Sequence, residues 1–216
     1  MSTRSPAATA IVAPTAVVGA GALISGGLFA AALGADASTE ALAAVPMAGI
    51  VGLLVAAFAY GWPRLLGLPG PWHVTWLLLL VGFASALAAL WTPLPNPMQW
   101  LPAAIGVGVL ATFVTQLVRG TGTSQRLEAT LASLLGVVVV ALGSGWVGVV
   151  TTSALAGSPL TVPVAAGAVA LATLGVLWVL AQRIPRMGVW AVAALGIGPL
   201  LAAGSAAYFV QRLLSA

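Results

Sequence analysis

The residues best suited to chemistry lie in one polar stretch, RGTGTSQR, at residues 119–126. It offers two guanidinium groups, Arg119 and Arg126, and two glycines, Gly120 and Gly122, just before an expected helix. Glycine-rich turns, helix N-termini and guanidinium groups all bind phosphate, so one hypothesis is a site for an anion or an anionic lipid headgroup. The alternative is helix capping, in which a loop hydroxyl and the terminal charges complement the ends of two helices.

A second group of residues leads toward this stretch along one helix face. Gly108, Thr112 and Gln116 follow one another at four-residue spacing, which places their side chains on the same face. Such a face could line a groove for a polar ligand. Threonine and glutamine can equally form hydrogen bonds to a neighbouring helix, which is the alternative use of the same residues.

Pro199 is the best candidate for a helix kink, because it follows Gly196 and Gly198 well inside an apolar segment. Many transporters use a discontinuous helix to expose backbone groups to a substrate. A kink can also be purely structural.

The remaining polar residues exclude most other classes of chemistry. The chain has three acidic residues, no cysteine and one histidine, His73. They form no carboxylate pair, nucleophile–base set or metal-binding cluster, so we expect no enzyme activity, no metal and no cofactor. The arginines are scattered and form no basic stripe, so we expect no nucleic-acid partner. The apolar segments hold no deep ionisable residue, which argues against a proton-coupled pump.

The elements that carry these residues are membrane helices. Only 5% of the 216 residues are charged, against about 25% in soluble domains, and the mean hydropathy is +1.14. We therefore expect an all-α fold, a polytopic transmembrane bundle forming a single integral membrane domain over residues 1–216. Each span needs roughly 20 apolar residues. Seven stretches qualify: residues 11–33, 41–62, 72–92, 98–118, 128–152, 160–182 and 187–208.

The arginines predict how the spans are oriented. They fall before the first span and in alternate connections, whereas the connection that contains Asp36 and Glu40 has none. Because basic residues collect on the cytoplasmic side, this pattern predicts a cytoplasmic N-terminus in the plasma membrane. Arg212 is the exception on a seven-span topology. A break of the last segment at GIGP, residues 196–199, would give six spans as the alternative.

Tryptophans and small residues add expectations about position and packing. The tryptophans should lie near the two membrane surfaces, with Trp146 approaching the outer one. Small residues at four-residue spacing favour close helix packing, as at Ala141 and Gly145. The last span has a comparable set. It comprises Gly198, Ala202 and Ala206.

Two stretches carry a resemblance. YGWPRLLGLPGP, residues 60–71, and the sequence from Phe113 to Trp146 resemble uncharacterised actinobacterial multi-pass membrane proteins, some of them labelled permeases. The resemblance implies no settled activity. We therefore expect a structural or accessory subunit of a membrane complex, with the lipid bilayer, other membrane subunits or a second copy as partners. The alternative is a permease or lipid-handling protein for a neutral or anionic small molecule.

Overall fold

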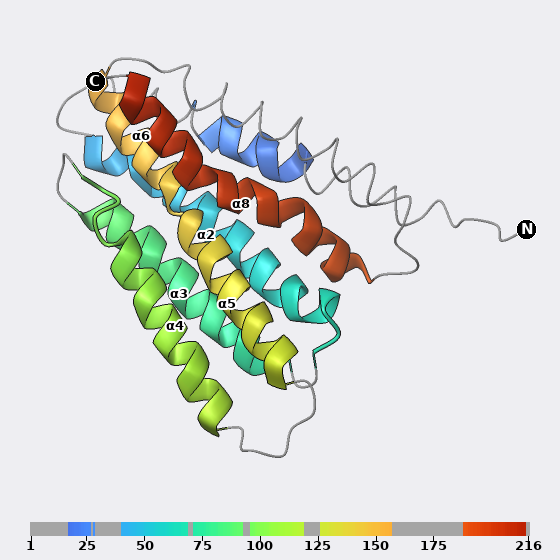
Figure 1. Ribbon diagram of the computed structural model, residues 1–216. Coiled ribbons are helices and arrows are strands. Elements are labelled where there is room, and N and C mark those ends of the chain that lie inside the picture. Colours follow the sequence, from blue (N-terminus) through green and yellow to red (C-terminus); the bar gives the residue numbers. More distant parts are fainter. Residues whose placement is uncertain are drawn as a thin grey trace, which may run out of the picture.

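The computed structural model describes residues 17–26, 28, 40–68, 71–92, 96–118, 126–156 and 188–214. This part of the chain contains helices and no strand, which confirms the all-α expectation for it (Figure 1). A short apolar helix, Val17–Gly26, comes first. The longer helices are α2 (Glu40–Leu65), α3 (Trp72–Trp91), α4 (Leu101–Val118), α5 (Arg126–Leu142), α6 (Gly145–Ala156) and α8 (Val189–Leu214).

Five helical stretches are long and apolar enough to cross a membrane, with α5 and most of α6 counted as one. They correspond to the second, third, fourth, fifth and seventh expected spans, although α8 runs past residue 208 to Leu214. The first expected span is described only at residues 17–26 and 28, and the span at 160–182 lies outside the described residues. The total of seven spans stays a prediction.

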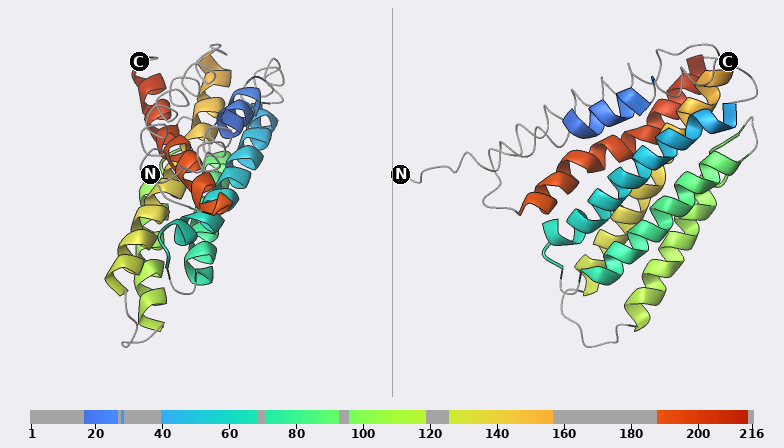
Figure 2. Two further views of the ribbon diagram at one scale, coloured as in Figure 1. Left: turned by 90° about the vertical axis from the view of Figure 1, so that its right-hand side faces the viewer. Right: turned by 180° about the vertical axis from the view of Figure 1, so that it is seen from behind.

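The described helices run between two opposite ends of the bundle. At one end, called here the Arg64 end, α2 and α4 finish while α3, α5 and α8 begin. At the other, the Asn96 end, α2 and α4 begin while α3, α6 and α8 finish (Figures 1 and 2). The α3–α4 and α4–α5 connections therefore lie at opposite ends, as the alternation of arginines predicts.

Helix α2 forms the centre of the bundle, in contact with α3, α5, α6 and α8. Its buried face includes Val51, Val55 and Phe58, all fully buried. Helix α4 is peripheral: it packs on α3 and α5, and only 17% of its span is buried, against 50–67% in the other four spans. Its outer face is apolar and suits contact with lipid.

The end of α2 is fixed by a Schellman motif, which also sets the position of Arg64. Gly67 adopts φ 64°, the left-handed conformation that glycine reaches without steric cost. The Leu68 amide donates to the Pro63 carbonyl at 3.0 Å, and the Gly67 amide donates to the Arg64 carbonyl at 3.3 Å. These two bonds satisfy carbonyls of the last turn and place Arg64 inside it.

The fifth span differs from the single helix expected over residues 128–152. It is interrupted at Gly143 and Ser144, between α5 and α6. The Ser144 amide donates to Ala141 at 3.1 Å and the Trp146 amide to Gly143 at 3.2 Å, both three residues back. This tighter turn falls where two glycines lower helix propensity, and it brings α6 against α8.

Candidate functional site

Gly108, Thr112 and Gln116, called here the α4 stripe, share one face of α4, and they are the buried residues of that helix. The face is turned toward α3 and α5. A Cβ atom at Gly108 would lie 2.5 Å from a Val137 methyl group and 3.1 Å from a Val81 methyl group. The absence of a side chain at Gly108 therefore allows α4 to pack closely on both neighbours. At the position of Gly108, the α4 stripe is therefore a contact between helices.

The polar groups of the stripe have different partners. Thr112 is fully buried and its hydroxyl donates to the Gly108 carbonyl of its own helix at 2.9 Å. Gln116 is 4% exposed, and its Oε1 atom accepts no hydrogen bond. An unsatisfied buried carbonyl is costly, so Gln116 is the polar group of α4 with unused binding capacity. A groove-lining role for these residues stays a prediction.

One of the four residues of the expected anion site is described. Arg126 begins α5, half-buried, and its Nη2 atom donates to the backbone carbonyl of Gln116 at 3.3 Å. This bond joins the end of α4 to the start of α5. Arg119, Gly120 and Gly122 lie outside the described residues. Glu128 is exposed in the first turn of α5, where its charge complements the helix dipole.

Pro199 lies inside α8, which continues through it from Val189 to Leu214. The last segment therefore does not break at residues 196–199, and that route to a six-span topology is wrong. Proline lacks an N–H, so the carbonyl of Leu195 loses its usual helical donor. Kinking at Pro199 stays a prediction.

The α5–α6 break crosses α8 at very close range. A Cβ atom at Gly145 would lie 2.3 Å from the carbonyl carbon of Gly204 and 2.3 Å from the amide nitrogen of Ser205. The two backbones are therefore in direct contact. The Ser205 hydroxyl donates to the Leu142 carbonyl at 2.9 Å, across the same crossing.

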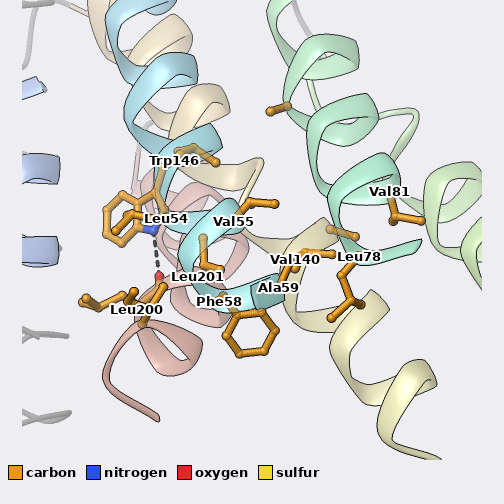
Figure 3. Packing of buried hydrophobic residues seen from close by; sticks show 14 of the residues in the cluster. Leu54, Val55, Phe58, Ala59, Leu78, Val81, Val140, Trp146, Leu200 and Leu201 are labelled. Atoms are coloured by element: carbon orange, nitrogen blue, oxygen red, sulfur yellow. Dashed lines mark hydrogen bonds between the residues drawn. The ribbon is translucent and has the colours of Figure 1, made fainter. Parts of the chain in front are cut away.

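Trp146 completes this crossing with its side chain inside the bundle. Its predicted approach to the outer membrane surface stays a prediction. The side chain is fully buried and its Nε1–H donates to the Leu200 carbonyl at 2.8 Å (Figure 3). A carbonyl has two lone pairs, so Leu200 can accept this bond within a helix. Two sequence features indicate a close contact here: the Gly143–Ser144–Gly145 sequence and the small pair Ala141 and Gly145. The face of α8 that makes the contact has no comparable sequence pattern.

A small cavity lies next to the break, toward the Asn96 end. Its volume is about 10 Å³, enough for about one water molecule. Its polar lining groups are the Ser85 and Ser144 hydroxyls, which donate to the Val81 and Ala141 carbonyls at 2.7 and 2.6 Å. Both hydroxyls thus have backbone partners three or four residues back along the chain, and no charged residue lines the cavity.

Arg212, the exception in the charge pattern, is anchored at the Asn96 end. Its Nη1 atom donates to the Asn96 side-chain carbonyl and, at 3.1 Å, to the Tyr208 hydroxyl. Elsewhere, His73 lies at the start of α3, at the Arg64 end. Within the described residues no three histidine, cysteine or acidic side chains are grouped as a metal site would require.

Comparison with known proteins assigns no relationship. No protein-family model, curated protein or solved structure matches the chain.

Proposed function

We propose that this chain is a structural or accessory subunit of a membrane complex. The observation that supports the proposal most strongly is the α5–α6 crossing with α8, where buried polar side chains join one helix to another. Trp146 and Ser205 donate in opposite directions across the Gly145–Gly204 contact. Groups used in this way hold the bundle together and are not turned toward a reacting molecule.

A third bond of the same kind lies nearer the Arg64 end. The Trp62 Nε1–H of α2 donates to the Ala132 carbonyl of α5 at 2.9 Å. Gly136, one turn along α5, leaves room for Leu78, whose methyl groups lie 2.8 and 3.0 Å from the position of an added Cβ. The Trp62 hydrogen bond and the close packing at Gly136 thus join α2, α3 and α5 into one scaffold.

Helix α4 supplies the face on which this proposal places a neighbouring subunit. Leu110, Val114 and Leu117 are 67%, 56% and 69% exposed in the isolated chain. Their side chains form part of an apolar surface that is continuous along the peripheral helix. A neighbouring transmembrane helix could pack on this surface by van der Waals contact.

The experiment is purification from native membranes in a mild detergent, followed by native mass spectrometry. The proposal predicts complexes heavier than the 21.4 kDa chain, with a second subunit at fixed ratio. A bulky Leu110→Trp substitution should release that subunit. The matched Leu80→Trp substitution, at a side chain 68% exposed on α3, should retain it. Recovery of the isolated chain alone would contradict the proposal.

We propose that the protein lies in the plasma membrane with its Arg64 end on the cytoplasmic side. Arg64 and Arg126 both lie at this end of the described structure. Arg212 lies at the opposite end, where its side chain is bonded to Asn96 and Tyr208. The excess of arginine at one end supports the orientation.

A permease or lipid-handling role is the second candidate, favoured by the unsatisfied Gln116 Oε1 atom. A polar ligand or water passing along α4 would supply its missing donor. Because the chain has no cysteine, a Gln116→Cys variant can be probed with a water-soluble thiol reagent. Fast labelling would favour this role. Labelling as slow as that of Val137→Cys, at a fully buried apolar position of α5, would contradict it.

A further inference from the structure

Arg64 is held at the membrane end of α2 by an unusual set of partners. Its guanidinium carbon lies 3.4 Å from the centre of the Tyr60 ring and 5.4 Å from the centre of the Trp72 ring. Its Nη1 atom donates to the Tyr60 carbonyl, one turn back along the helix. The side chain is therefore folded toward the bundle, and its charge lies about one turn deeper than an extended arginine would place it.

None of these partners neutralises the charge of Arg64. Two are aromatic rings and one is a backbone carbonyl, and the described part of the chain gives the guanidinium no carboxylate. Glu40, on the same helix, is about 36 Å away at 1.5 Å per residue. Guanidinium carries five N–H donors, so most remain for another acceptor.

Two helix N-termini add positive potential at the same place. Helix α3 begins at Trp72, and α8 begins one residue before Trp190. The Tyr60 ring centre lies 6.1 Å from that of Trp72 and 4.9 Å from that of Trp190, so both helix starts flank Arg64. Neither first turn contains an acidic residue, and the N-cap residue of α3 makes no side-chain capping bond. The positive ends of α3 and α8 therefore add to the charge of Arg64, and together they exceed the negative C-terminal end of α2, in whose last turn Arg64 lies.

The exposed aromatic rings indicate the depth of this cluster in the membrane. Trp72 and Trp190 are 56% and 50% exposed. Exposed tryptophan prefers the headgroup layer, where its ring contacts acyl chains and its N–H meets polar groups. Lipid phosphates occupy the same layer. A phosphate accepts charge-assisted bonds from guanidinium with high directional specificity.

We propose that Arg64, with Tyr60, Trp72 and Trp190, forms a binding site for the phosphodiester group of an anionic membrane lipid. The guanidinium binds the phosphate through its free N–H groups. The Tyr60 and Trp72 rings fix the guanidinium plane, Trp190 packs on Tyr60, and the exposed Trp72 and Trp190 rings contact the glycerol and upper acyl chains. These residues differ from those of the anion site predicted at residues 119–126. The site requires no partner subunit.

The test compares lipid retention by the full chain and two arginine variants. Detergent-solubilised protein is titrated with phosphatidylglycerol or phosphatidylcholine, and bound lipid is counted by native mass spectrometry. Arg64→Gln should weaken phosphatidylglycerol binding about tenfold. It should weaken phosphatidylcholine binding less, because the choline cation offsets the charge of the same phosphate group. The matched Arg212→Gln variant removes one arginine from the other end and should retain wild-type binding. Equal binding by all three proteins would overturn the proposal.

Two further arms separate a built site from surface charge and from free phosphate. Tyr60→Leu keeps Arg64 but removes the ring that orients it, and should also weaken phosphatidylglycerol binding; full retention would mean that charge alone attracts the lipid. An excess of inorganic phosphate should not displace the lipid, because the rings contribute contacts that phosphate lacks. Displacement would assign the site to the free ion and overturn the lipid proposal.

A measurement on the unsubstituted protein is independent of how the variants fold. A photoreactive phosphatidylglycerol should cross-link to peptides that contain residues 60–72 or 189–192. Cross-links confined to other peptides would contradict the assignment.

Discussion

Gly145 offers the sharpest test of how the described helices are held together. Gly145→Ala adds one methyl group at a position where the Cβ atom would lie 2.3 Å from the Gly204 carbonyl carbon and 2.4 Å from its oxygen. These are backbone atoms of α8 and cannot rotate away. The helices would have to separate by more than about 1 Å to reach ordinary contact distance.

That separation would also stretch two hydrogen bonds. The Trp146–Leu200 and Ser205–Leu142 bonds, at 2.8 and 2.9 Å, both cross the same contact. Overpacking costs about 1–3 kcal/mol, and each bond between membrane helices contributes about 0.6 kcal/mol. We expect Gly145→Ala to lower the free energy of unfolding by about 2–4 kcal/mol.

The assay is equilibrium unfolding in mixed micelles of increasing sodium dodecyl sulfate, followed by circular dichroism. Gly106→Ala is the matched control, because a Cβ atom there meets nothing within 4 Å. Gly106→Ala should leave the free energy of unfolding unchanged or raise it by up to about 1 kcal/mol, because alanine has the higher helix propensity. The backbone at Gly145 is not in the left-handed region, so strain would not explain a loss. If Gly145→Ala unfolds like the control, the close crossing is refuted.

Three substitutions test single polar groups by the same unfolding assay. Trp146→Phe removes the donor to Leu200 and part of a buried ring, so stability should fall by about 1–2 kcal/mol; no loss would mean that the indole is not bonded there. Gln116→Met replaces an unsatisfied buried acceptor by an apolar side chain, and should raise stability by about 1 kcal/mol; a clear loss would reveal a partner for Gln116. Thr112→Val removes a hydroxyl bonded only to Gly108 of its own helix, so a change above about 1 kcal/mol would contradict that assignment.

Much of the helix pattern could be predicted because it depends on local properties. A long apolar run between proline or polar clusters has to satisfy its own backbone in lipid, so α2, α3 and α4 begin and end near the expected residues. The common face of Gly108, Thr112 and Gln116 also follows from spacing alone. Whether that face lines a groove or packs on another helix depends on the neighbours, which spacing does not specify.

The contacts of α8 could not be predicted for the same reason. Gly198, Ala202 and Ala206 have the four-residue spacing of a packing face, yet Ala206 is exposed. Gly198 of this set does pack on Phe58 of α2, but the backbone contact with the α5–α6 break is made by Gly204 and Ser205, on a different face. The neighbouring segment determines which face of α8 is used, because the break between α5 and α6 places Gly145 directly opposite Gly204.

Trp146 and Arg64 illustrate how tertiary contacts override residue preferences. Tryptophan favours the headgroup layer because its N–H finds a polar partner there. At Trp146 the carbonyl of Leu200 fills that need inside the bundle. An arginine near a helix end is expected to extend toward water. The Tyr60 ring and backbone carbonyl bind the Arg64 side chain and keep it folded toward the bundle. In the sequence, only the four-residue spacing of Tyr60 and Arg64 hints at these contacts.

The central claim is that the described helices cross a membrane with the Arg64 and Asn96 ends on opposite sides. Single cysteines at Leu66, 45% exposed, and at the exposed Asn96 test it in a chain that has no other thiol. With a membrane-impermeant maleimide on intact cells, we predict labelling of Asn96→Cys at once and of Leu66→Cys only after permeabilisation. Labelling of both variants in intact cells, or of neither, would contradict the account.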